Sequence, residues 1–274
     1  MADRIGLVLR HALLLCGAVV MLAPFVLMIS LSLKPIGEIF APEFRLLPVH
    51  WAAWQNYSDA FTKVPMLRFL LNGVIVTFCI FAAQAVTALP MAYALAKLRW
   101  RGRDTAFLLV LAALLIPPQV PAIPLYIGLW QLDLLNSYAA IILPSTISVF
   151  GIFLMRQFFR TVPDDLIAAA RMDGLSEFAI VWRIMLPTAA PALAAFGCLS
   201  LIWHWNDFFW PYITVQSEQL MTPPLGIAFF SDAEAGTNWG PLMAAATVTT
   251  APLVLAFLVA QRAFVRGVTM TGVK

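Results

Sequence analysis

Six long segments without a charged side chain constrain this chain more than any other feature. A helix needs about 20 mostly apolar residues to cross the hydrocarbon core of a bilayer, and no other gap between charges approaches that length. Hydrophobic residues make up 62% of the 274 and charged residues only 11%, whereas a soluble domain is roughly half apolar and a quarter charged. The sequence therefore predicts an all-α integral membrane protein. The charge-free segments are about 12–32, 69–96, 105–132, 134–155, 184–206 and 235–261.

These segments predict a bundle of six transmembrane helices that forms one membrane domain over residues 1–274. The expected spans are about 12–33, 69–94, 106–128, 137–158, 187–210 and 241–262. The third expected span contains Pro117 and Pro118, followed by Pro121 and Pro124, and proline interrupts helix hydrogen bonding. Interrupted helices in membranes line a wet cavity or are buried in protein. A transport pathway and a static packing kink are therefore both open interpretations of this span.

The distribution of Lys and Arg predicts the orientation, because cytoplasmic loops carry an excess of both. With the N-terminus inside, four basic residues lie outside and the other 13 lie in the cytoplasm. We therefore expect a multi-pass protein with both termini cytoplasmic. The net charge of +3 follows from this bias and indicates no nucleic-acid partner. The four outer residues are Lys34, Arg45, Lys63 and Arg68.

The stretch Pro163–Pro187 is the longest strongly polar interruption in the second half of the chain. Its first proline suits the first position of a helix, and Asp164 and Asp165 follow where the helix dipole favours acidic residues. Gly174 suits the left-handed cap that ends a helix, and Ser176 can cap the next one. The sequence predicts a cytoplasmic helix–turn–helix.

One face of the first of these helices is expected to carry mostly small side chains. Leu166, Ala169 and Ala170 are spaced so that they share it. The backbone of a partner protein could therefore approach this face closely.

Sequence motifs for nucleotide binding and for common hydrolytic active sites are missing from the chain. There is no nucleotide-binding glycine loop, no zinc-protease motif and no hydrolase serine motif, and the three histidines are too scattered for a metal site. Acidic residues are essentially absent from the spans, which argues against coupling to protons or sodium. Three alternatives remain: a self-sufficient carrier or channel, a membrane-embedded enzyme, and a permease driven by a partner. The driven permease best fits the absence of nucleotide-binding motifs and of coupling residues.

The polar stretch resembles the "EAA" loop of permease subunits in ABC importers, whose signature is Glu-Ala-Ala-x-x-x-Gly and ends in Leu-Pro. The glutamate position holds Ala168 here, and either Asp164 or Asp165 could supply a substitute charge. The resemblance implies that this loop docks on an ATP-hydrolysing subunit. The residues that it assigns to the loop are Asp165, Ala168, Ala169, Ala170, Asp173, Gly174, Leu186 and Pro187.

The rest of the chain resembles the carbohydrate branch of that family, in particular the smaller permease of the maltose importer. The marks are Ser32-Leu33-Lys34, Asn56-Tyr57, Asn72, Ala92-Tyr93-Ala94, Trp205-Asn206-Asp207-Phe208, Gln261 to Gly267 and the tail Thr269 to Lys274.

This resemblance implies a machine of several subunits in a bacterial cytoplasmic (inner) membrane. A second homologous permease, two ATP-binding subunits and an extracytoplasmic solute-binding protein would be its partners, together with membrane lipid. The chain itself would be no enzyme and would bind no cofactor, because ATP and magnesium belong to the ATPase subunits. The solute would be a sugar, with glycerol 3-phosphate as the alternative. The loop expected to contact the binding protein includes Ser231, Asp232, Asn238 and Trp239.

Five polar or aromatic residues are candidates for contact with the solute along the path. A sugar ring can lie on an aromatic face while amides bond its hydroxyl groups. The alternative for each is a hydrogen bond between helices or a place in the interfacial aromatic belt. The candidates are Asn72, Gln84, Gln119, Trp203 and Asn206.

Overall fold

The computed structural model describes residues 2–232 and 236–272, and it is helical over most of them. The chain divides into two compact units. The first unit comprises Met1–Leu67 and Gly226–Pro252, and the second comprises Arg68–Leu225 and Leu253–Lys274. The prediction of one membrane domain stays a prediction.

The first unit is built around two long helices, parts of which are among the most apolar segments of the chain. Asn56 is buried and its side-chain amide donates hydrogen bonds of 2.9 Å to the carbonyl groups of both Ser32 and Lys34. This amide therefore fastens a short helix to the C-terminal end of the first long one. Its elements are α1 (Ala2–Ser32), α2 (Ile36–Ile39), α3 (Ala53–Thr62), the 3₁₀ turn η4 (Ala228–Phe230), the strands β1 (Ser231–Asp232) and β2 (Gly236–Thr237), and the start of α15 (Trp239–Gly272). Helix α14 (Pro223–Ile227) joins the two units.

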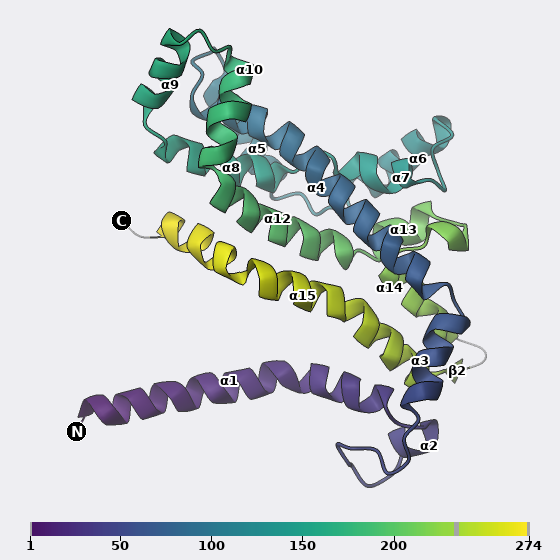
Figure 1. The fold of residues 1–274 in the computed structure, drawn as a ribbon. Coiled ribbons are helices and arrows are strands. Elements are labelled where there is room, and N and C mark those ends of the chain that lie inside the picture. Colours follow the sequence, from purple (N-terminus) through teal and green to yellow (C-terminus); the bar gives the residue numbers. More distant parts are fainter. Residues whose placement is uncertain (1, 233–235, 273–274) are drawn as a thin grey trace. The chain divides into compact units, whose positions relative to one another are not determined.

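The second unit holds the polar stretch and most of the predicted spans. In Figure 1 its helices α9 and α10 lie at the C-terminal end of the long helix α4. The elements are α4 (Met66–Ala96), α5 (Arg103–Ala113), α6 (Ala122–Gln131), α7 (Tyr138–Ile142), η1 (Leu143–Ser145), α8 (Val149–Thr161), α9 (Asp164–Met172), α10 (Glu177–Ile180), the π-helical turn η2 (Val181–Met185), α11 (Leu186–Thr188), α12 (Ala190–Trp205), α13 (Phe209–Thr214) and η3 (Glu218–Leu220).

The described residues contain three helices that are long and apolar enough to cross a membrane: Leu9–Ser32, Met66–Ala96 and Trp239–Leu258. Two bent helix pairs raise the number to five if each pair is one span. Tyr138–Ser145 and Val149–Thr161 meet at 42°, and Glu177–Thr188 and Ala190–Trp205 meet at 82°. The three helices overlap the first, second and sixth expected spans, the bent pairs overlap the fourth and fifth, and none of these candidates overlaps the third.

The third expected span, 106–128, is not a continuous helix. Helix α5 ends at Ala113 and α6 begins at Ala122, and the eight residues between them are outside any helix. The physical reason is local: Pro117 and Pro118 have no amide hydrogen to continue the helix, and each also disfavours helical backbone in the residue before it. A kink was expected here, and the structure has a full interruption.

Close packing in the second unit depends on two glycines that face aromatic rings. A Cβ atom added at Gly151 of α8 would lie 2.5 Å from the ring of Phe196 in α12, and one added at Gly197 of α12 would lie 2.8 Å from the ring of Phe81 in α4. At such distances a side chain on either glycine would force the facing ring to shift. The rings of Phe81 and Phe196 are themselves 6.0 Å apart, so α4, α8 and α12 interlock around them.

Candidate functional site

The polar stretch folds as a helix, a turn and a helix, as expected, and we name Pro163–Pro187 the coupling segment after the role that the resemblance implies for it. Asp164 and Asp165 occupy the first turn of α9, and Gly174 ends it with a φ of 79°. The Ser176 hydroxyl caps α10 by accepting a 3.3 Å hydrogen bond from the amide of Ala179. Pro163 precedes the helix as its N-cap residue, one position earlier than the sequence suggested.

The two faces of α9 differ in what they contact. Ile167 and Ala170 are 2% and 3% exposed, and they pack into a core formed with residues of α4, α8, α10, η2 and α12. Ala170 is therefore buried, whereas Leu166 and Ala169, with which the sequence placed it on one face, are exposed. The reason is that Ile167 and Ala170 are three residues apart on α9, so both can pack against the core from one side of the helix. The residues exposed on the outer side and at the turn are Asp165, Leu166, Ala168, Ala169, Met172, Asp173 and Gly174.

Lys97, just past the end of α4, holds the start of the coupling segment. Its side chain is 7% exposed, and its ammonium group donates to the carbonyl of Val162 at 2.5 Å and to the carboxylate of Asp164 at 2.6 Å. The bond from Lys97 holds the pKa of the Asp164 carboxyl below its usual range. Asp164 is thus committed to its own chain. Within the described residues Asp165 forms no ion pair, so its charge is available to a partner.

This difference gives a prediction for the two neighbouring carboxylates. If the coupling segment docks on an ATPase subunit, as the resemblance implies, Asp165→Asn should weaken the association because it removes a charge from the exposed face, whereas Asp164→Asn should leave the association in place. The measurement is the amount of ATPase subunit that copurifies with each variant as salt is raised. Equal retention for both variants would contradict the assignment.

The pH dependence of the Lys97–Asp164 pair follows from the same lowered pKa. A carboxyl whose pKa is depressed in the folded state contributes stability above its unfolded pKa of about 4, and that contribution is lost as the pH falls through the folded pKa. The pair therefore persists throughout the physiological range.

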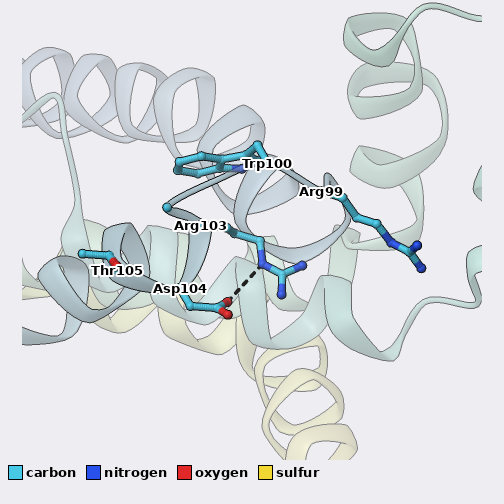
Figure 2. Close-up of a pocket in the computed structure, with 6 residues that line it drawn as sticks. Arg99, Trp100, Arg103, Asp104 and Thr105 are labelled. Atoms are coloured by element: carbon cyan, nitrogen blue, oxygen red, sulfur yellow. Dashed lines mark hydrogen bonds and ion pairs between the residues drawn. The ribbon is translucent and has the colours of Figure 1, made fainter.

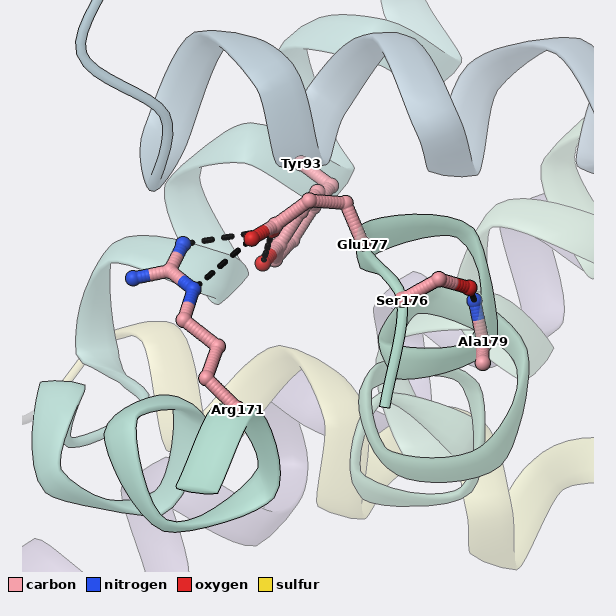
Figure 3. A network of polar contacts seen from close by, with 5 residues as sticks. All are labelled: Tyr93, Arg171, Ser176, Glu177 and Ala179. Atoms are coloured by element: carbon pink, nitrogen blue, oxygen red, sulfur yellow. Dashed lines mark hydrogen bonds and ion pairs between the residues drawn. The ribbon is translucent and has the colours of Figure 1, made fainter. Parts of the chain in front are cut away.

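A second polar contact holds the other end of α9, as Figure 3 shows. The Arg171 guanidinium donates to both carboxylate oxygens of Glu177, at 2.7 and 3.2 Å. The hydroxyl of Tyr93, a buried residue of α4, donates to the same carboxylate at 2.5 Å. We name these three residues the latch, because they connect α9, α10 and α4. The hydrogen bond that Arg171 donates to the Glu177 carboxylate also raises the pKa of Arg171.

The C-terminal end of the coupling segment changes direction sharply. The chain passes through the π-helical turn η2, then Leu186 and Pro187, before the 82° bend into α12. Proline has no amide hydrogen to bond a carbonyl one turn earlier, and single π turns often occur where the normal helical pattern is interrupted. Leu186 is half-buried and Pro187 is exposed. These two residues mark the corner between the coupling segment and α12.

The basic loop before α5 forms an open hollow of about 360 Å³ (Figure 2). The Nε of Arg103 pairs with Asp104 at 3.1 Å, and the indole of Trp100 donates to the carbonyl of Ala94. Arg99 also lines the hollow. An arginine-rich, open loop with a tryptophan suits a membrane–water boundary.

Two of the five pathway candidates are buried and bonded within the chain. The amide of Asn72 donates to the carbonyl groups of Gln219 and Met221, both at 2.9 Å, and its oxygen accepts from the Tyr138 hydroxyl at 2.6 Å. Asn72 is 2% exposed. It therefore connects α4 to the segment after α13 and to α7.

Gln84 is the second buried candidate. Its amide nitrogen donates to the carbonyl of Ser145 at 2.8 Å and lies 3.1 Å from Nε2 of His204, while its oxygen accepts from the Ser200 hydroxyl at 2.6 Å. These bonds join α4, the bend between η1 and α8, and α12. Sequence reasoning did not assign Ser200 or His204 to this site, although their spacing of four residues on one helix indicated a shared face.

The other three candidates are exposed. Gln119 lies in the interruption between α5 and α6. Trp203 is 62% exposed near the end of α12, and Asn206 follows the helix with its amide bonded to the carbonyl of Ile202 at 2.8 Å. Near them, the rings of Phe208 and Tyr212 stack 5.2 Å apart. The structure does not bring the five candidates into one cavity.

The residues expected to contact a binding protein lie at the strands of the first unit. Ser231 pairs with Thr237 across β1 and β2, and Asn238 donates its amide to the carbonyl of Phe230 at 3.0 Å. The ring of Trp239 at the start of α15 packs edge-on against Phe40 at 6.0 Å. The side chain of Asp232 lies outside the described part, as does Lys274 at the end of the predicted tail.

Known proteins resemble the chain along most of its length. Residues 86–270 match the family "Binding-protein-dependent transport system inner membrane component". The permease protein AraQ of an arabinooligosaccharides transport system from Halalkalibacterium halodurans is 33% identical over 92% of this chain and 90% of its own. The permease protein UgpE of an sn-glycerol-3-phosphate transport system from Yersinia pestis is 33% identical over 94% of each.

Solved structures share the fold. A bacterial ABC transporter involved in the import of the acidic polysaccharide alginate has a chain that matches with a TM-score of 0.82 and 24% identity, over 96% of this chain and 97% of that one. The match of the family over more than half of the chain, together with relatives at one-third identity, settles the classification. The chain belongs to the family of inner membrane components of binding-protein-dependent transport systems, and it is a membrane permease subunit rather than an enzyme.

Proposed function

We propose that this chain forms one half of the translocation pathway of an importer for a mono- or oligosaccharide. A second homologous permease forms the other half, and two ATP-binding subunits supply the energy. An extracytoplasmic binding protein delivers the sugar. The observation that carries this proposal is the family match, which includes the whole coupling segment with its exposed outer face.

In this proposal the six apolar segments all cross the membrane, the third with its interruption, and both termini lie in the cytoplasm. The coupling segment then faces the ATPase subunits. The strands and the start of α15 lie on the opposite side of the membrane, where the binding protein docks. ATP binding and the loaded binding protein together favour the outward-open state, and hydrolysis returns the importer to its resting state.

The sugar assignment is supported by the arabinooligosaccharides permease among the relatives and by the fold shared with the alginate importer. The equal identity to the glycerol-3-phosphate permease makes that solute the second candidate. A phosphate favours cationic partners, and the six apolar segments contain no Lys or Arg. A neutral sugar is therefore the better fit to the proposed path.

The test is a mild-detergent pull-down of this chain from its native membrane, followed by mass spectrometry and an ATPase assay. We expect an ATPase, a second permease and vanadate-sensitive hydrolysis that a binding protein stimulates. Stimulation is then compared with arabinooligosaccharides, alginate oligosaccharides and glycerol 3-phosphate as the added solute. A chain that purifies alone and supports flux in liposomes without ATP would overturn the importer, and stimulation by glycerol 3-phosphate alone would overturn the sugar.

A further inference from the structure

Helix α4 and the coupling segment are joined at three places, all within the second unit. Lys97 bonds the residues that start α9, and the latch bonds the residues that end it. Between these points Ala92 and Tyr93 of α4 and Ile167 and Ala170 of α9 belong to one buried core. Two charged clamps around an apolar contact resist both rotation and separation, because each clamp would have to break as the core opened.

We infer that Tyr93, Glu177 and Arg171 are positioning residues that make α4 move with the coupling segment. The inference rests on the proposed function, since it is the ATPase subunit that would displace this segment. Force applied to α9 and α10 is then delivered first to α4, and not only to α12, which continues the chain after the coupling segment. The covalent route to α12 passes through the π-helical turn and an 82° bend, whereas the latch bonds α10 directly to α4.

The geometry of the latch supports a role beyond local stability. Glu177 accepts hydrogen bonds from residues on two different elements, 6 positions before it and 84 positions before it in the chain. The Tyr93 side chain is buried, whereas about 45% of the Arg171 and Glu177 side chains is exposed. The carboxylate therefore joins an exposed part of the segment to a phenol fixed in the core. A cap for α10 does not need this arrangement, because Ser176 already caps that helix.

A far-reaching effect is expected because α4 carries both buried amides described above. Asn72 and Gln84 lie along the same helix, and each is bonded to other elements of the second unit. A shift of α4 would therefore be felt at α7, α12 and the bend before α8. This route connects the coupling segment to Gln84 in the middle of the second expected span and to Asn72 at its start.

The test measures the distance between spin labels on the two elements in the assembled importer. Labels at Met172→Cys, which is 89% exposed on α9, and Met91→Cys, which is 41% exposed on α4, are placed in a background where Cys16, Cys79 and Cys198 are serine. We expect the same distance distribution in the nucleotide-free and vanadate-trapped states. With Tyr93→Phe and Glu177→Gln added, we expect the fraction of vanadate-trapped importers at the parent distance to fall about tenfold. This is the effect expected from the loss of one charge-assisted hydrogen bond.

The matched control is Tyr57→Phe, which removes a hydroxyl that bonds Ser32 at 3.1 Å in the first unit, and it should leave the distribution unchanged. A distance that changes on trapping without the latch substitutions would overturn the inference, as would a latch variant that behaves like the parent. If an ATPase still copurifies, either of these two results contradicts the inference about the latch and leaves the proposed function standing. Failure of the unlabelled parent to retain any ATPase would sink the proposed function and the latch together.

Discussion

Replacing Gly174 with valine should abolish ATP-driven uptake while the chain still inserts into the membrane. Gly174 has a φ of 79°, in the left-handed region, and a Cβ there would have open space around it. The cost is therefore backbone strain and not a steric clash, at roughly 1–3 kcal/mol for a residue that avoids this region. The turn between α9 and α10 would change its conformation and so change the surface offered to an ATPase. The measurement is uptake and copurification of the ATPase by the assembled importer.

The chain provides its own control for this substitution. Gly102 also has a positive φ, 92°, and lies in the loop before α5, outside the coupling segment. Gly102→Val should cost a similar amount of backbone strain without loss of coupling. Normal uptake by the Gly174 variant, or equal loss in both variants, would contradict a docking role for the coupling segment.

Asn72→Asp should destabilise the protein by about 3 kcal/mol or more. The amide of Asn72 is the donor for two carbonyl groups, those of Gln219 and Met221. A carboxylate would place acceptors against both carbonyls in a site that is 2% exposed to solvent, and a buried charge or polar group without a partner is costly. Thermal stability in detergent, followed by size-exclusion chromatography, measures the effect.

Asn206→Asp is the matched control, because Asn206 is exposed. We expect a melting temperature close to that of the parent. If Asn72→Asp were as stable as this control and changed only the affinity for the solute, then Asn72 would belong to the translocation path and the structural role assigned here would be wrong.

The coupling segment was predictable from sequence because its signals are local. A proline, two aspartates, a glycine and a serine each act within one turn of their own position. The residues that bind this segment to α4 gave no such signal. Tyr93 precedes Glu177 by 84 positions, and the commitment of Asp164 depends on Lys97, which is 67 positions away. Tertiary packing alone decides these partners.

The same limit applies to the spans and to the pathway candidates. The prolines of the third span were visible, but the length of the interruption depends on how α5 and α6 pack, which periodicity does not report. An Asn or Gln within an apolar segment is compatible both with contact to a solute and with contact to another helix. For Asn72 and Gln84 the structure shows bonds to other elements of the second unit. These bonds support a hydrogen bond between helical elements rather than a contact with the solute.

The two glycines that face aromatic rings limit how the helices can rearrange. Phe196 of α12 sits over Gly151 of α8, and Phe81 of α4 sits over Gly197 of α12. Each ring fills the space that a Cβ atom on the facing glycine would need, so sliding one helix along another requires the ring to change its rotamer or the helices to separate. A displacement that keeps both contacts would therefore move α4, α8 and α12 together.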